Sequence, residues 1–456
     1  MIQRPIARRL AALVIADLVC VLAALWLSPV LYPMLKHGKF VSIGYLHSPV
    51  WQLCVVVQIY LFYLAGLYDT EDSWSRMLAL TRIAIASGGM TMILLLAYFF
   101  QRRQSRGVIL LYWPLAFLSV ALTRTLIGRL RPAPQRNVIL VCKGRPASMD
   151  IELVQSATCG DYLFKGIVVC NGHEAPPALD VPVTQIADPS ELERIVKDEG
   201  ISELVVGAGC DSHPELVRDL VLLSHRHVLL LDPITFFEQV TGKLPCEHLT
   251  DASYLFLIVP RKGVPYPKLR RLLDMGLAFF GIVVSFPFWI LVAVAVKLSS
   301  KGPILVTEER VGLEGESFPL IKFRTDAGPA DHSAEPIAMD HPSVTAVGRL
   351  LRRTRIDELP QLINVLRGEM SLIGPRPERS ALVEQFEREI PYYQERHAVR
   401  PGITGWAQVN QGYVLGAEAA KEKLAYDLFY LKNQSFTLDL LIAFMTIREL
   451  LLGRGQ

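Results

Sequence analysis

Four long apolar runs in the first 130 residues constrain the fold more than any other feature of this sequence. They cover roughly residues 10–32, 50–68, 83–100 and 108–127. Each approaches the ~20 residues that a helix needs to cross a bilayer. A signal peptide would explain only the first run, and no small-residue cleavage site follows it. We therefore predict a four-helix transmembrane bundle over residues 1–131.

Arginines at the two ends of this region predict its orientation. Three precede the first run and others cluster at the end of the fourth: Arg4, Arg8, Arg9, Arg124, Arg129, Arg131 and Arg136. Positively charged ends face the cytoplasm, so both ends are predicted to be cytoplasmic. The loop at 101–106 carries three further arginines and disagrees, and we give the count of spans more weight. Asp17 lies inside the first run, where it can be hydrated or pair with an arginine.

The next segment has the pattern of a soluble α/β domain. Buried-strand runs at 137–142, 166–170, 204–206 and 228–231 alternate with helical patterns at 190–199 and 214–225. This alternation predicts a Rossmann-like, doubly wound parallel sheet, which we place at residues 137–259. The first turn holds only Gly144 of a nucleotide-binding fingerprint, which favours a regulatory or oligomerising role over dinucleotide binding. Whether this domain binds any ligand is left open.

Composition excludes two other classes of protein. The net charge is only +3, which argues against a nucleic-acid binder. The seven cysteines include no C-x-x-C pair, which argues against a zinc site and indicates reduced thiols facing the cytoplasm.

A fifth apolar run, at 275–296, contains a proline near its middle. Pro287 must bend a helix there, and Ser285 can satisfy a freed carbonyl. Basic residues flank both ends of the run: Lys268, Arg270, Arg271, Lys297 and Lys301. We therefore predict a re-entrant helix at 272–297 whose two ends lie on the same side of the membrane, within a catalytic domain at 268–456 of the α+β class.

Two adjacent carboxylates, Asp357 and Glu358, follow a run of arginines. Helical apolar spacing after them predicts a helix that starts at about Asp357, with Pro360 in its first turn. Alternatively, Thr354 and Asp357 form a capping box, and the helix starts three residues earlier. Carboxylates among cations at a helix start suit metal-dependent chemistry on a phosphate, although acidic residues also stabilise a first turn without any catalytic role. A hairpin at 306–323 and a polar loop at 327–342 precede this stretch.

Three motifs occur in this region in the following order: K-F-R-T at 322–325, the run R-I-D-E-L-P-Q-L-I-N-V-L-R-G-E-M-S-L-I-G-P-R-P at 355–377, and R-P-G-I-T-G-W-A-Q-V-N at 400–410. Together they resemble the motifs of the bacterial sugar transferases, which are monotopic polyprenyl-phosphate phosphoglycosyl transferases. With the N-terminal runs and the α/β segment, the chain resembles the large form of the family, used in exopolysaccharide and O-antigen initiation. One departure is that Phe286, not serine, precedes Pro287.

The resemblance implies a reaction in which a sugar 1-phosphate moves from a UDP-sugar to undecaprenyl phosphate, with release of UMP. It implies Asp357 as the nucleophile of a covalent phosphosugar intermediate and Glu358 as a ligand of the cofactor Mg²⁺. It also implies a phosphate- and nucleotide-sugar-binding set: Lys322, Arg324, Arg352, Arg376, Arg400 and Gln408. The expected location is the bacterial inner membrane, with the catalytic domain facing the cytoplasm, inner-membrane lipids around it and a homodimer as one assembly.

Two other functions compete with this one. A membrane scaffold or regulator with an inactive catalytic domain would not need the intact Asp357–Glu358 pair. A processive glycosyltransferase would be expected to carry D-x-D metal ligands, and none occurs in the sequence. The residues leave the transferred sugar and the polysaccharide pathway open; UDP-linked glucose or galactose is the expectation from the resemblance.

Overall fold

The computed structural model of this chain describes residues 3–37, 49–65, 67, 76–101, 106–130, 136–143, 147–158, 162–170, 182–186, 190–207, 209–210, 214–226, 228–248, 266–327, 341, 343–411 and 416–451. These residues form two compact units, Met1–Gln135 and Arg136–Gln456. Each unit is described by itself.

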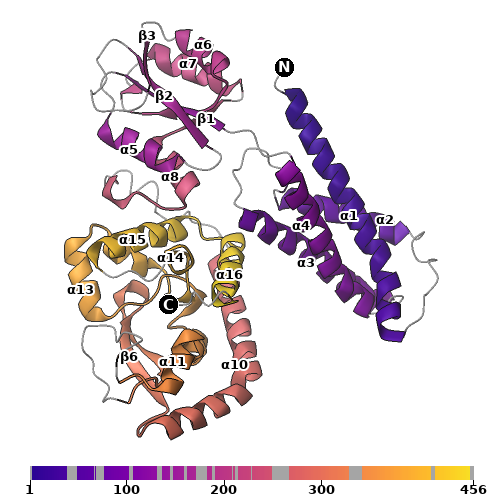
Figure 1. Ribbon diagram of the computed structural model, residues 1–456, viewed down its shortest axis with the longest axis vertical. Helices are drawn as coiled ribbons and strands as arrows, with labels where there is room; N and C mark the ends of the chain where they lie inside the picture. Colours follow the sequence, from indigo (N-terminus) through magenta and orange to yellow (C-terminus); the bar gives the residue numbers. More distant parts are fainter. Residues whose placement is uncertain are drawn as a thin grey trace. The chain divides into compact units, whose positions relative to one another are not determined.

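Four helices that share one apolar core make up the first unit (Figure 1). They are α1 (Gln3–His37), α2 (Pro49–Leu64), α3 (Arg76–Gln101) and α4 (Arg106–Leu130), so each predicted apolar run is helical. In the described residues, α1 and α4 hold apolar stretches long enough to cross a membrane, Leu13–Tyr32 and Gly107–Leu126. The stretches in α2 and α3 are shorter, Cys54–Tyr63 and Leu80–Leu95. A bundle in which all four helices span stays a prediction.

Asp17 is fully buried and forms an ion pair with Arg124, which links α1 to α4. Arg124 also donates to the carbonyl oxygen of Leu67, 2.9 Å away. The acidic residue in the first apolar run is therefore paired with an arginine, as one of the two predicted alternatives required. A charge in such a position is costly unless it has a partner, so the pair fixes how these helices meet.

The second unit begins with a five-stranded parallel sheet of order β3-β2-β1-β4-β5. The strands are β1 (Arg136–Lys143), β2 (Tyr162–Cys170), β3 (Val183–Ile186), β4 (Ile201–Val206) and β5 (Leu229–Leu231). On one face lie α6 (Ser190–Asp198) and α7 (Pro214–Ser224); on the other lie α5 (Ser148–Ala157) and α8 (Pro233–Thr241) (Figure 1). The predicted doubly wound sheet is confirmed, and β3, α5 and α8 are elements that the sequence patterns did not reveal.

The segment that ends this sheet is inserted into the core of the following part of the chain. After α8 and the turn at Gly242, the short helix η2 (Cys246–His248) follows. Leu244, between them, is 0% exposed and packs in a cluster with Val311, Leu424 and Leu428. Its N–H donates to the carbonyl oxygen of Ala425 at 3.0 Å. Leu244, which follows α8 at the end of the α/β segment, therefore belongs to the core of the C-terminal part.

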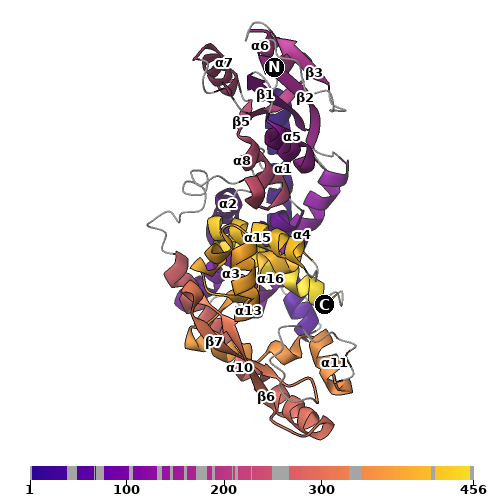
Figure 2. The same ribbon diagram turned by 90° about the vertical axis from the view of Figure 1, so that its left-hand side faces the viewer.

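The C-terminal part combines helices with two small two-stranded sheets. Its elements in order are α10 (Tyr266–Ser299), β6 (Leu305–Val311), η3 (Leu313–Gly315), β7 (Ser317–Phe323), α11 (Ala346–Arg353), η4 (Ile356–Glu358), α12 (Gln361–Arg367), β8 (Ser371–Ile373), α13 (Ser380–Glu389), η5 (Tyr393–Ala398), β9 (Gly402–Thr404), α14 (Trp406–Asn410), α15 (Ala417–Lys432) and α16 (Phe436–Leu451). The predicted hairpin is confirmed, since β6 and β7 pair antiparallel (Figure 2). The predicted loop at 327–342 lies mostly outside the described residues.

The long helix α10 bends along its length (Figure 1). Pro287 lies inside it, and the Ser285 hydroxyl donates to the carbonyl oxygen of Gly281 at 2.6 Å. A proline removes one helical hydrogen bond, and a serine that bonds back to the preceding turn also bends a helix. The second half of α10 packs Val292 and Val296 against Phe323 of β7. Lys268–Ser299 meets the length and composition required for a membrane span, and its course in a membrane stays a prediction.

Replacement of the inserted leucine should destabilise the second unit. Leu244→Ala leaves a cavity in a core with no exposed surface at that position, which costs roughly 2–5 kcal/mol of unfolding free energy. Thermal unfolding of the full chain in detergent measures the change. Leu222→Ala is the matched control because Leu222, on α7, is 52% exposed. Equal melting temperatures for both variants would contradict the insertion.

Candidate active site

The Asp357–Glu358 pair lies on a short 3-10 turn between two helices. Helix α11 ends at Arg353, and Thr354 turns its hydroxyl back to the carbonyl oxygen of Leu350 at 2.8 Å. Arg355 then adopts a left-handed conformation with φ 53°, which no regular helix can contain. The prediction of a helix starting at about Asp357 is therefore wrong at its start, and so is the capping-box alternative, because α12 begins only at Gln361.

Arg376 and Lys322 supply positive charge to Glu358. The Arg376 Nη2 atom lies 3.3 Å from Glu358 Oε1, and the pair is largely buried. Burial alone would raise the pKa of Glu358, but Arg376, Lys322 and Arg355 together hold it below its ordinary value. Glu358 is therefore a stable anion in this site.

Asp357 has the opposite shift. Burial and the negative charge of Glu358 raise its pKa to about 6, against the opposing effect of Lys322 and Arg352. Two neighbouring carboxylates in one site often separate in this way, because the first charge disfavours the second. Asp357 is still mostly ionised near pH 7, and it is a more basic carboxylate than an ordinary aspartate. Separated pKa values in a carboxylate pair are a signature of functional sites.

The sequence analysis missed a carboxylate that holds the cations of this site. Glu308 on β6 forms ion pairs with Arg310, with Lys322 at 3.7 Å and with Arg379 at 3.8 Å. Although burial opposes ionisation, Lys322, Arg310 and Arg379 lower the pKa of Glu308 to about 2. The available signal was its place in the predicted hairpin, across from the strand that carries Lys322.

Two motif segments approach each other so closely that only glycine fits between them. Strands β8 and β9 pair in parallel, and the N–H of Gly374 donates to the carbonyl oxygen of Thr404 at 2.8 Å. A methyl group added at Gly405 would collide with the carbonyl oxygen of Gly374. The glycines in G-P-R-P and P-G-I-T-G therefore permit the backbone contact that brings Arg376 to the dyad.

Arg352 and Arg324, two further residues of the predicted binding set, form hydrogen bonds within the protein. Arg352 lies near Asp357 and donates from Nε to Thr325 Oγ1 at 2.8 Å. Arg324 is buried and donates to the carbonyl oxygens of Ser300 and Lys301, just beyond α10. Their phosphate-binding roles stay predictions.

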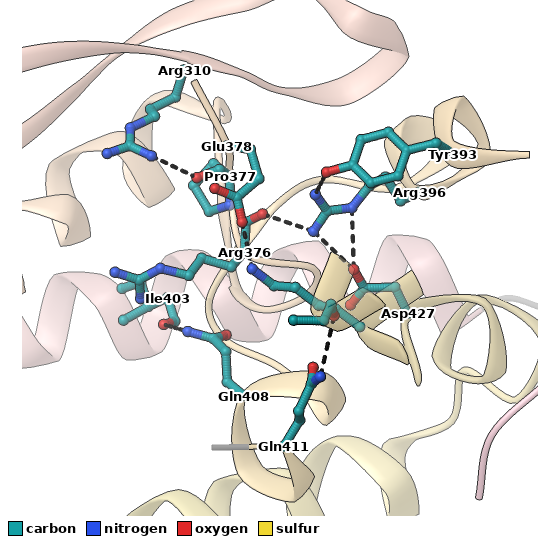
Figure 3. A network of polar contacts seen from close by, with 12 residues as sticks. Arg310, Arg376, Pro377, Glu378, Tyr393, Arg396, Ile403, Gln408, Gln411 and Asp427 are labelled. Atoms are coloured by element: carbon teal, nitrogen blue, oxygen red, sulfur yellow. Dashed lines mark hydrogen bonds and ion pairs between the residues drawn. The ribbon is translucent and has the colours of Figure 1, made fainter. Parts of the chain in front are cut away.

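Arg400 and Gln408 also bond to carbonyl oxygens. The Nε atom of Arg400 donates to Gly368, at the end of α12, over 2.9 Å. The Gln408 amide donates to Ile403 at 3.2 Å (Figure 3). Its Oε1 atom is buried without a hydrogen-bond partner among the described residues, and the nucleotide-sugar-binding roles of Arg400 and Gln408 stay predictions.

The dyad fits Mg²⁺ only in combination with a substrate phosphate. No group of three or more His, Cys, Asp or Glu side chains in the described part of the chain could hold a metal ion alone. Mg²⁺ in phosphoryl-transfer sites commonly takes one or two carboxylates, with substrate phosphates completing its shell. Asp357 and Glu358 match that smaller donor set, and Glu358 is the residue whose pKa favours the anionic form.

Comparisons with known proteins agree on the C-terminal part. The family model described as bacterial sugar transferase matches residues 266–453. The UDP-N-acetylgalactosamine-undecaprenyl-phosphate N-acetylgalactosaminephosphotransferase of Aeromonas hydrophila is 43% identical over 48% of this chain and 51% of its own length. The UDP-glucose:undecaprenyl-phosphate glucose-1-phosphate transferase of Escherichia coli strain K12 is 40% identical over 42% of each chain. The chain thus spans about half or less of the length of these two relatives.

A shorter relative is matched almost entirely. The exopolysaccharide production protein PSS of Rhizobium leguminosarum bv. phaseoli is 38% identical over 41% of this chain and 98% of its own length. The similarity is therefore concentrated in the segment that carries the dyad.

The ion pairs of Glu308 with Arg310, Lys322 and Arg379 should make the free energy of unfolding depend on pH. The folded-state pKa of about 2 is below the ordinary 4.5, so the carboxylate stabilises the fold above about pH 4.5 and this contribution is lost as pH falls toward 2. We expect Glu308→Gln to lower the unfolding free energy by roughly 1–3 kcal/mol at pH 7, since each pKa unit is worth about 1.4 kcal/mol and the site is partly hydrated.

Unfolding curves of the two proteins between pH 7 and pH 3 give this difference, which should narrow below pH 4.5. Glu309→Gln is the control, because Glu309 is the neighbouring exposed residue on the same strand. A difference that stays constant with pH would contradict the assignment.

Proposed function

The chain belongs to the bacterial sugar transferase family, and we propose that it transfers a sugar 1-phosphate from a UDP-sugar to undecaprenyl phosphate and releases UMP. The observation that carries this proposal is the intact Asp357–Glu358 pair, surrounded by Lys322, Arg352 and Arg376 within the segment that matches the family. A scaffold with an inactive catalytic domain would have no need for this charge arrangement. The product would begin a repeat unit of an exopolysaccharide or O-antigen.

Asp357 is the proposed nucleophile. One of its carboxylate oxygens attacks the phosphorus that bears the sugar, a P–O bond to Asp357 forms, and the P–O bond to UMP breaks, with UMP leaving as the anion. The phosphate oxygen of undecaprenyl phosphate then attacks the same phosphorus and regenerates Asp357. Covalent catalysis divides one difficult transfer into two, which suits one water-soluble and one membrane-bound substrate. The raised pKa of Asp357 fits this role, because a more basic carboxylate is a better nucleophile.

The cations have complementary roles in this proposal. Arg376 and Lys322 keep Glu358 ionised, so that Glu358 is ready to bind Mg²⁺. When bound, Mg²⁺ neutralises part of the charge on the diphosphate. Arg352 lies near Asp357, and arginine suits bidentate phosphate contacts. Arg324, Arg400 and Gln408 support the site from the ends of α10 and α12 and from α14.

The sugar is the least determined part of the substrate. The relatives named above are described as acting on UDP-N-acetylgalactosamine in one case and UDP-glucose in another. We propose a UDP-linked hexose or N-acetylhexosamine as the donor.

We also propose that α10 enters and leaves the membrane on the cytoplasmic side. Nucleotide sugars are cytoplasmic, so Asp357 must face the cytoplasm. Most large apolar side chains of α10 are exposed, including Phe279, Phe280 and Phe288, which suits a lipid environment. The bend at Ser285 and Pro287 supports a helix that returns to its side of entry. The four N-terminal helices would then bring the chain back to the cytoplasm in the bacterial inner membrane.

Substitution of the nucleophile tests the reaction. Asp357→Asn should abolish UMP release and the adduct, because an amide is a poor nucleophile. UMP is measured after incubation with UDP-sugars, Mg²⁺ and undecaprenyl phosphate, and intact-protein mass after incubation with donor alone reveals the adduct. Glu358→Gln should keep a detectable adduct but need more Mg²⁺.

The outcomes separate the roles. An adduct on Asp357→Asn would exclude this residue as the nucleophile, and UDP release by the wild type would indicate a glycosyltransferase instead. An unchanged Mg²⁺ titration for Glu358→Gln would exclude its metal role.

Cysteine labelling tests the course of α10. Lys268→Cys and Lys301→Cys, each in a cysteine-free background, should both resist an impermeant maleimide on intact cells and react after the cells are broken. His47→Cys, between the first two apolar runs, is the control expected to react on intact cells. Reaction at position 301 but not at 268 would show that α10 crosses the membrane.

A further inference from the structure

Arg396 and Asp427 form a buried ion pair next to the backbone of Arg376, and neither residue has a role in the proposed reaction. Arg396 and Asp427 are 2% and 1% exposed. The Asp427 Oδ2 atom accepts from Arg396 Nε at 3.1 Å and from Nη2 at 2.8 Å. Arg396 Nη1 donates to the Tyr393 hydroxyl at 2.7 Å (Figure 3). Three hydrogen bonds to two side chains therefore fix the plane of one guanidinium.

The same guanidinium also reaches the backbone of the active-site segment. Its Nη2 atom donates to the carbonyl oxygen of Arg376 at 3.0 Å. In Figure 3 the segment Arg376–Glu378 runs between Arg310 and Arg396. Arg310 donates to the carbonyl oxygen of Pro377 at 3.2 Å, so successive peptide groups are held by side chains from different elements.

Pro377 has no N–H, which disfavours regular strand pairing of this segment. Side chains donate to the carbonyl oxygens of Arg376 and Pro377 instead. The Arg376 side chain leaves this fixed backbone and places Nη2 3.3 Å from Glu358 Oε1. A small rotation of the Arg376 peptide would therefore change the distance between Arg376 Nη2 and Glu358 Oε1.

Stability alone does not explain the ion pair. A buried pair can often be replaced by apolar residues of similar volume without loss of stability. An apolar replacement would nevertheless leave the Arg376 carbonyl without its donor. The hydrogen bond from Arg396 to the Arg376 carbonyl oxygen is therefore the interaction that an apolar residue at position 396 could not replace.

We propose that Arg396, oriented by Asp427 and Tyr393, is a positioning residue that fixes the Arg376 peptide and thereby the contact of Arg376 with Glu358. This inference rests on the proposed function, because it assigns a role in that reaction. Arg396 touches neither substrate in this scheme and acts through Arg376.

A double-mutant cycle tests this dependence. Arg396→Lys keeps a positive charge for Asp427 but loses the planar group that bridges two acceptors. We expect it to lower kcat/KM for the UDP-sugar at least tenfold in the wild-type background and less than threefold in an Arg376→Lys background. UMP release is followed for hours, so that the rates of slow variants can be measured. Tyr393→Phe should lower kcat/KM less than Arg396→Lys, because it keeps both hydrogen bonds of Arg396 Nη2.

The control separates positioning from general destabilisation. Leu428→Ala changes a fully buried apolar residue next to Asp427 on α15, and should lower the melting temperature while reducing activity equally in both backgrounds. An equal fold-loss for Arg396→Lys in both backgrounds would overturn the inference. If Arg396→Lys does not fold, the same cycle with Asp427→Asn decides. A wild type that releases no UMP would contradict the proposed function, whereas an active wild type with an additive cycle contradicts this inference alone.

Discussion

Two neighbouring carboxylates can remain in a partly buried site only if cations balance them. Here Arg376 and Lys322 supply that balance, and both are held in turn. Glu308 holds Lys322 from the hairpin. The carbonyl oxygen of Arg376 accepts from Arg396, and Gly374, two residues earlier, lies so close to Gly405 that only glycine fits. The site is therefore a set of alternating charges distributed over β6, β7, the turn at Asp357 and the segment after β8. Each charge is costly without its neighbours, so these distant stretches of sequence depend on one another.

Regular periodicity made part of this arrangement predictable. The parallel strands, the helices at Ser190 and Pro214 and the hairpin follow from apolar patterns that persist over several residues. Strand β3 escaped because it has four residues, two of them polar, and gains its place from pairing with β2. The start of the helix after the dyad was misplaced because apolar spacing does not distinguish the 3-10 turn Ile356–Glu358 from the first turn of α12, which begins only at Gln361. Arg355 adopts a positive φ just before this turn, and no side-chain pattern marks an arginine for that conformation.

The candidate site also contains residues that could be predicted from the sequence and residues that could not. Asp357, Glu358, Lys322 and Arg376 stand in recognisable motifs, and the structure gathers them. Glu308 and Asp427 are as closely connected to the site, yet neither stands in a motif that we assigned to it from the sequence. Their significance depends on which cations lie near them, and contacts between residues 308 and 379 or 396 and 427 cannot be read from local spacing. Long-range charge pairing is a property of the fold.

The insertion of Leu244 has a thermodynamic consequence. The leucine belongs to the chain segment that closes the parallel sheet, but it completes the core around α15, the helix that carries Asp427. Any molecule that binds the native α/β segment more tightly than its unfolded form would therefore stabilise, by linkage, the core that Leu244 completes. The same coupling acts in reverse, so occupancy of the catalytic part would strengthen the sheet. The α/β domain thus has an energetic connection to the chemistry through the residue that it places in the core next to Asp427.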